Sequence, residues 1–122
     1  MNVPLAFLVI AFFLPPEADA ERHDGNSLQA DCREAIKETD ATGEIRGANA
    51  GFCAGYLHGI TEALSLSGKL CIPSSVNDAQ GVRIMMKFFE DHPERLHERR
   101  FNLVMDAMTK AFPCKMPGVG AK

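Results

Sequence analysis

Apolar residues recur at helical spacing along four stretches of the chain, and no stretch alternates with the two-residue period of a β-strand. The pattern predicts helices over about 28–38, 44–66, 77–92 and 93–112. Short polar segments separate these helices, which favours packing between neighbours along the chain. We therefore predict an all-α fold, a small four-helix bundle-like domain.

Residues typical of helix ends support four of the helix boundaries. Gly68 follows the second predicted helix, and glycine is the usual residue just past a helix end. Asn77 is a good N-cap for the third helix, and Gln80 three residues later completes a capping box. Pro93 disfavours helical geometry at the residue before it and suits the first turn of the fourth helix.

The first 20 residues have the layout of a secretory signal peptide. An apolar run over 3–14 is followed by two prolines, and 18–20 reads Ala-Asp-Ala, a small-x-small cleavage signal. No Lys or Arg precedes the run, and the run is shorter than the about 20 residues that a membrane-spanning helix needs. We expect a cleaved leader over 1–20, with an uncleaved anchor as the alternative. A helical domain over 21–114 and a flexible tail over 115–122 would follow it.

The charge balance argues against a nucleic-acid or membrane partner. The full chain carries 13 Lys+Arg and 16 Asp+Glu, a formal net charge of −3. Cleavage after Ala20 removes two acidic residues and no basic one, which leaves −1. Such a balance favours neither nucleic acid nor an anionic lipid surface, so we expect neither partner after leader cleavage.

All four cysteines lie after the predicted leader, at Cys32, Cys53, Cys71 and Cys114. An even number in an exported chain favours disulfides, and no pair has the close spacing of a zinc site. Consecutive helices with short links pack antiparallel, which places the first two cysteines at similar distances from the first turn. The other two follow the ends of the second and fourth helices, at the same pole. We predict the pairs Cys32–Cys53 and Cys71–Cys114.

Four glycines occur at four-residue intervals along the second predicted helix: Gly47, Gly51, Gly55 and Gly59. Each costs about 1 kcal/mol relative to alanine inside a helix, so the set needs a compensating gain. Close approach of another helix would supply that gain. Either another helix of this chain or a second copy in a homodimer can cover this face, and the sequence leaves both open.

No arrangement of residues in the sequence points to catalysis. His58, His92 and His97 belong to no nucleophile–base pattern, and the cysteines are assigned to disulfides. No nucleotide-binding or phosphate-binding motif is present. We expect a binding protein rather than an enzyme, without a cofactor and without a metal.

The segment 52–60, Phe-Cys-Ala-Gly-Tyr-Leu-His-Gly-Ile, resembles the CxGY(I/L)xG(I/V) element of the Tai-type (Rap/Tai) type VI secretion amidase immunity protein family. The Cys-Ile-Pro at 71–73, the Asp-His-Pro-Glu-Arg-Leu-His at 91–97 and the Ala-Phe-Pro-Cys at 111–114 resemble its remaining elements, in the right order. The resemblance covers about 28–114. It implies a periplasmic, helical, disulfide-bonded and often dimeric protein. Such a protein would occupy the cysteine–histidine cleft of a peptidoglycan amidase effector that neighbouring bacteria deliver by type VI secretion.

A charged turn between the third and fourth helices is the candidate partner-binding site, because a protruding turn suits insertion into a cleft. Its six polar residues are Asp91, His92, Glu94, Arg95, His97 and Glu98. The alternative is a plain helix–helix corner, in which the acidic residues only complement the helix dipole.

A second function stays open from the sequence: a periplasmic helical structural or chaperone-like binding module without a cognate effector. Met85 and Met86, together with the glycine face, would supply apolar surface for such a module. A position in the core is the simpler interpretation of the two methionines.

Overall fold

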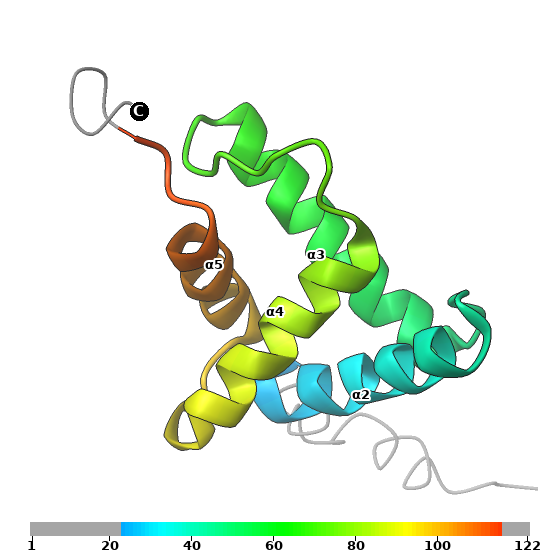
Figure 1. The fold of residues 1–122 in the computed structure, drawn as a ribbon. Helices are drawn as coiled ribbons and strands as arrows, with labels where there is room; N and C mark the ends of the chain where they lie inside the picture. Colours follow the sequence, from blue (N-terminus) through cyan, green and yellow to red (C-terminus); the bar gives the residue numbers. More distant parts are fainter. Residues whose placement is uncertain (1–22, 116–122) are drawn as a thin grey trace, which may run out of the picture.

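The computed structural model describes residues 23–115, so the predicted leader over 1–20 and the predicted tail beyond Lys115 lie outside the described residues. The described part contains four α-helices, one short 3-10 helix and no β-strand (Figure 1). These are α2 (Gly25–Thr42), α3 (Ala48–Leu66), α4 (Asp78–Asp91), η4 (Pro93–Arg95) and α5 (Arg100–Ala111). The predicted all-α, four-helix fold is confirmed.

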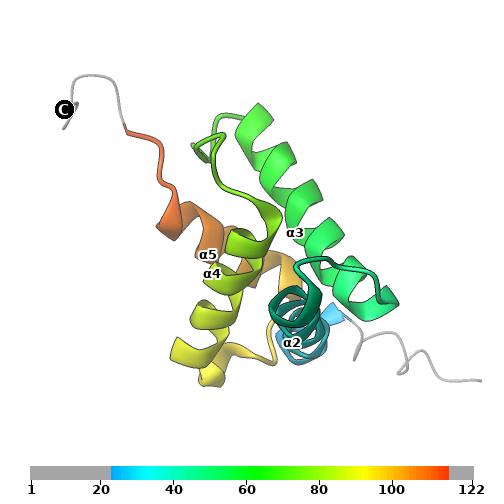
Figure 2. The same ribbon diagram turned by 45° about the vertical axis from the view of Figure 1, so that its right-hand side comes forward.

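The helices cross one another rather than lying aligned along their lengths. α2 packs against α3 and α4, and α5 packs against α3 and α4 from the other side. Figures 1 and 2 show α2 and α3 diverging from the turn that joins them, with α4 crossing between α3 and α5. The close antiparallel alignment expected for the first two helices is therefore not observed, although their buried faces meet.

The core lies where these four helices cross. Its largest fully buried side chains are Phe89, Leu28, Met85, Leu103 and Met108. Burial of each such side chain stabilises the fold by about 1.5–3 kcal/mol before the entropy of folding is subtracted. Met85 is thus a core residue, as the simpler interpretation of the methionine stripe predicted. None of the helices within 23–115 is long and apolar enough to cross a membrane.

Both predicted disulfides are confirmed. Cys32 on α2 is bonded to Cys53 on α3, with a Cα–Cα distance of 5.0 Å. Cys71, after α3, is bonded to Cys114, after α5, with a Cα–Cα distance of 4.9 Å. The Cys71 N–H also donates to the carbonyl of Phe112 at 3.1 Å. The C-terminal ends of α3 and α5 thus meet at one end of the molecule (Figure 1).

The first helix begins earlier and ends later than its apolar pattern predicts. Asp24 caps it, because the Asp24 carboxylate accepts a hydrogen bond from the Ser27 N–H at 2.9 Å. At the other end Gly43 adopts a left-handed conformation with φ of 75°, and its N–H donates to the Thr39 carbonyl at 2.9 Å. The predicted turn at 39–43 is therefore mostly a last helical turn.

α3 begins at Ala48 rather than at residue 44, and Gly47 is its N-cap. No side chain caps the first turn of α3, and the carboxylate of Glu38 on α2 instead binds the two residues just before the helix. It accepts the Gly47 N–H at 3.0 Å and the Arg46 N–H at 2.7 Å, and these hydrogen bonds lower the pKa of Glu38. A Cβ on Gly47 would collide with this carboxylate. Gly47 therefore leaves room for this contact between α2 and the start of α3.

α5 begins at Arg100, seven residues after the predicted start at Pro93. The segment in between has other hydrogen-bond partners. The N–H groups of Gly25 and Asn26, at the start of α2, donate to the carbonyls of Glu98 and Leu96, each at 3.0 Å. These bonds hold the segment 96–99 against the start of α2, and α5 begins after it.

Candidate functional site

The six predicted partner-binding residues lie together on the turn between α4 and α5. Asp91 ends α4, Glu94 and Arg95 lie in η4, and Glu98 precedes α5. Three of the six side chains, those of Asp91, Glu94 and His97, are exposed to solvent. The turn is thus accessible to a partner. Some of its side chains hold it against α5, and others face solvent.

Arg95 supports the turn from inside. Its Nε and Nη2 donate to the two carboxylate oxygens of Glu98, both at 2.8 Å, and Nη2 also donates to Asp106 on α5 at 2.7 Å. The guanidinium also lies 5.5 Å from the ring centroid of Phe88. Only 28% of the Arg95 side chain is exposed. These bonds raise the pKa of Arg95 and lower that of Glu98, so both groups stay charged and hold the turn to α5.

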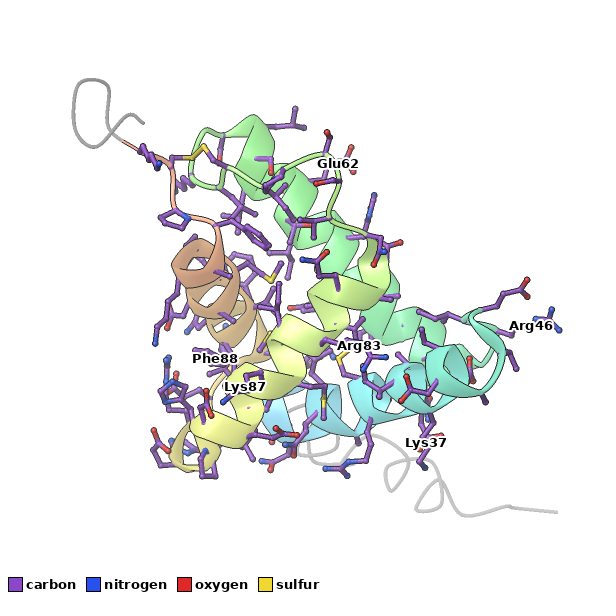
Figure 3. All side chains as sticks on the ribbon, in the orientation of Figure 1. Lys37, Arg46, Glu62, Arg83, Lys87 and Phe88 are labelled. Atoms are coloured by element: carbon purple, nitrogen blue, oxygen red, sulfur yellow. A yellow bond between two sulfur atoms is a disulfide. The ribbon has the colours of Figure 1, made fainter. Side chains whose placement is uncertain are left out.

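The outward face of the turn is acidic. A hydrogen bond from Lys87 lowers the pKa of Asp91, and Figure 3 shows Lys87 projecting from the same helix. The Glu94 carboxylate has a lowered pKa because its own backbone N–H and then His92 stabilise its charge. The His92 ring packs on Phe88, with centroids 4.6 Å apart. The two carboxylates therefore stay ionised at neutral pH, on a turn whose backbone is fixed.

A groove of about 580 Å³ opens beside this turn, where three distant segments of the chain meet. His23 and Asp24 come from the start of the described chain, and Tyr56 comes from α3. The third side is formed by His97 and by 99–101 at the start of α5. The groove is thus built by tertiary packing and has no counterpart in any single sequence motif.

Aromatic rings and an arginine form one wall of the groove. The Arg100 guanidinium lies 4.8 Å from the ring centroid of Phe52 and 4.6 Å from that of Tyr56. The two rings stack on each other with centroids 5.6 Å apart. Phe52 is 40% exposed and Phe101, on the groove's rim, is 48% exposed. In the sequence Phe52 and Tyr56 belong to the element over 52–60, and no sequence pattern joined them to Arg100 and Phe101.

The glycine face of α3 has no covering helix among the described residues. A Cβ built on Gly51, Gly55 or Gly59 would meet no atom within 4 Å. Leu66, at the end of the same face, is 85% exposed. The alternative in which another helix of this chain covers the glycines is therefore not supported between residues 23 and 115.

The histidines and acids of residues 23–115 form no cluster of three groups that could hold a metal. His58, for example, is accounted for by a contact between its Nδ1 and the Asp78 carboxylate at 3.1 Å. This contact links α3 to the first turn of α4 on an exposed surface.

The described residues thus form an all-α domain with two disulfides, a charged turn held by ion pairs, and a groove lined in part by aromatic rings. A family model described as Rap1a immunity proteins matches residues 24–114. The chain therefore belongs to the Rap1a immunity protein family, which assigns it an immunity function carried out by binding a protein effector. The comparison with curated proteins found no match, and the comparison with solved structures found none either.

Proposed function

We propose that this chain is a periplasmic immunity protein that binds a peptidoglycan amidase delivered by type VI secretion and blocks its catalytic cleft. The observation that carries the proposal is the turn over 91–98, which family membership places in a protein that must bind an effector. Internal ion pairs hold this turn in one shape before any partner arrives. A preorganised turn loses little conformational entropy when it inserts into a cleft, so more of the contact energy contributes to affinity.

The charge of the turn suits a cysteine–histidine cleft. The carboxylates of Asp91 and Glu94 face outward and have lowered pKa values. A catalytic imidazole that becomes protonated beside the cysteine thiolate would attract such a carboxylate. Occupation of the cleft would then block the substrate by steric exclusion, without any chemistry by the immunity protein itself.

The proposed periplasmic location rests on two features. Residues 1–20 have the layout of a cleavable leader, and all four cysteines of the chain are paired. Disulfides persist in oxidising compartments and are rare in the cytosol. An immunity protein in the periplasm would also meet the amidase where its peptidoglycan substrate lies.

The outward face of α3 is the proposed homodimer interface. Gly51, Gly55 and Gly59 leave the helix backbone open, and Leu66 extends the apolar surface beyond them. A second copy could bring its own α3 close to this face and offset the helix-propensity cost of the glycines. Light scattering of the eluting protein over a range of concentrations measures this directly, and a mass of one chain at all concentrations removes the proposal.

The test of the amidase proposal begins with capture of the partner from a periplasmic extract, on the mature chain with both disulfides intact. The captured hydrolase is purified, and its hydrolysis of peptidoglycan is measured with and without the immunity protein. We expect stoichiometric inhibition by the native chain. The pair Asp91→Asn and Glu94→Gln should weaken inhibition about tenfold or more, because it removes two outward charges and leaves Arg95 in place.

The matched control is the pair Asp40→Asn and Glu34→Gln on α2, which changes the net charge equally and should inhibit as the native chain does. Equal loss in both pairs would mean that overall charge, not the turn, governs binding. Capture of many unrelated clients with no inhibited hydrolase would favour the chaperone-like alternative instead.

A further inference from the structure

The groove beside the turn is lined by two arginines, Arg99 and Arg100. The Arg100 guanidinium lies on the rings of Phe52 and Tyr56 and interacts with the carboxylate of Asp31. The one acidic group of the lining, Asp24, already caps the first turn of α2. The guanidinium of Arg99 is therefore the charge of the lining to consider.

Arg99 is the residue of this groove best placed to bind an anion. Its backbone pairs with Asp24 in an isolated antiparallel bridge, which fixes its position, while its side chain is exposed. No ion pair or hydrogen bond engages its guanidinium within residues 23–115. A free guanidinium on a fixed backbone presents two parallel N–H donors, the geometry that suits a carboxylate.

The aromatic wall adds apolar contact beside this charge. Phe52, Phe101 and Leu66 are the exposed large hydrophobic residues of the described chain. Phe101 lines the groove, and Phe52 stacks on Tyr56, which also lines it. Arg100 lies against the rings of Phe52 and Tyr56, which orders all three side chains. Arginine and tyrosine dominate the binding energy of many protein interfaces, where ordered aromatic anchors lose little entropy.

We infer that this groove binds a segment of the effector that presents a carboxylate beside an aromatic or aliphatic side chain. The identity of the partner rests on the proposed function, whereas the chemistry of the groove does not. A single carboxylate fits better than an extended polyanion, because the lining offers one guanidinium, that of Arg99, without a partner among residues 23–115. The groove takes His97 from the same turn that carries Asp91 and Glu94, so one effector segment would contact both the turn and the groove.

The first test uses the mature chain and synthetic peptides of alternating Asp and Phe. A peptide of Asn and Phe and a peptide of Lys and Phe serve as matched probes. Fluorescence anisotropy should detect binding of the acidic peptide alone. Arg99→Glu should weaken it at least about tenfold, and Phe101→Ala about fivefold.

Two control variants make the same chemical changes elsewhere. Arg33→Glu reverses a charge on an exposed face of α2, and Leu66→Ala trims an exposed apolar residue of α3. Both should bind the acidic peptide as the native chain does. Thermal unfolding of each variant verifies the fold, and Arg99 is well suited because its bridge to Asp24 uses backbone atoms. Equal binding of the acidic and amide peptides, or no effect of Arg99→Glu, overturns the inference.

The second test separates this inference from the proposed function. If the amidase binds Arg99→Glu as tightly as the native chain, the groove lies outside the interface and the inference fails, while the immunity function stands. If the acidic peptide binds the groove but no amidase is inhibited, the proposed function fails and the groove keeps its assigned chemistry. A homodimer that Phe101→Ala converts to a monomer would assign the groove to a second copy and overturn the inference.

Discussion

Glycine has three different roles in this protein, and each follows from the space around its Cα atom. At Gly25 a Cβ would lie 2.9 Å from the carbonyl oxygen of Leu96, so α2 can approach the α4–α5 link only with glycine there. At Gly47 the same atom would collide with the carboxylate of Glu38. At Gly55 it would enter open space. A count of glycines therefore says little about the cost of replacing any one of them.

Alanine at two of these positions should have opposite effects on stability. Gly25→Ala forces apart α2 and the backbone at Leu96, which should lower the free energy of unfolding by roughly 1–3 kcal/mol. Gly55→Ala lowers the backbone entropy of the unfolded chain and causes no clash in the folded one. The free energy of unfolding should therefore rise by about 0.4–1 kcal/mol. Urea unfolding followed by circular dichroism measures both changes.

Unfolding of the native chain and of the two alanine variants is compared at a concentration where light scattering shows a monomer. In a homodimer through α3, the same Gly55→Ala change would weaken association instead. Destabilisation of the isolated chain by Gly55→Ala would contradict the open space seen around this residue.

The turn around η4 depends on ionised carboxylates, so acid should loosen it. Arg95 lowers the pKa of Glu98 from its usual value of 4.5. A carboxylate with a lowered pKa in the folded state stabilises the fold above the unfolded value, and this contribution disappears as the pH falls through the lowered value. The native chain should therefore lose its advantage over Glu98→Gln as the pH falls below about 4.5.

Thermal unfolding of both chains from pH 7 to pH 3 measures this convergence. Glu90→Gln, a change at an exposed position of α4, is the matched control and should run parallel to the native chain. A gap between the native chain and Glu98→Gln that stays constant with pH would mean that the Arg95 ion pair does not hold the turn.

Helical periodicity predicted the existence of all four helices, but tertiary contacts decided where two of them begin. The two residues before α3, Arg46 and Gly47, donate their N–H groups to the carboxylate of Glu38 on α2, and the helix starts after them at Ala48. α5 starts at Arg100 because the carbonyls of Leu96 and Glu98 bond to the start of α2. Neither partner can be recognised from the local pattern, since each depends on how α2 lies in the folded chain.

At the candidate site, too, the sequence predicted one part and tertiary packing decided the other. The turn over 91–98 could be predicted because its charged residues are consecutive in the sequence. The inward position of Arg95 could not, because its partner Asp106 lies on α5. The aromatic groove joins Tyr56, Arg100 and the residues near His23, and only the packing of three segments brings them together.

Two disulfides that differ in solvent exposure cross-link the chain. Cys32 and Cys53 are fully buried, whereas Cys71 is exposed at the end of the molecule. The chain-entropy model assigns about 3 kcal/mol to the first loop and about 4 kcal/mol to the second, a large part of the about 5–15 kcal/mol that stabilises a typical domain. The more exposed bond thus closes the loop with the larger entropic effect.

Mild reduction of the folded protein should open Cys71–Cys114 first, because a thiolate reagent can reach it without unfolding the chain. Loss of this bond alone should lower the free energy of unfolding by about 4 kcal/mol. Alkylation of the released thiols at intervals, followed by peptide mass spectrometry, gives the order. In denaturant the two bonds should open at similar rates, and equal rates in the folded protein would contradict the difference in burial.

The two covalent loops follow each other along the chain, from 32 to 53 and from 71 to 114, and do not interlace. A chain that crosses an export channel with its N-terminus first presents Cys32 and Cys53 before Cys71 emerges. An oxidant that joins each new thiol to the preceding free one would therefore form the native pairs in order. A newly exported immunity protein could then reach its final covalent form without a disulfide isomerase.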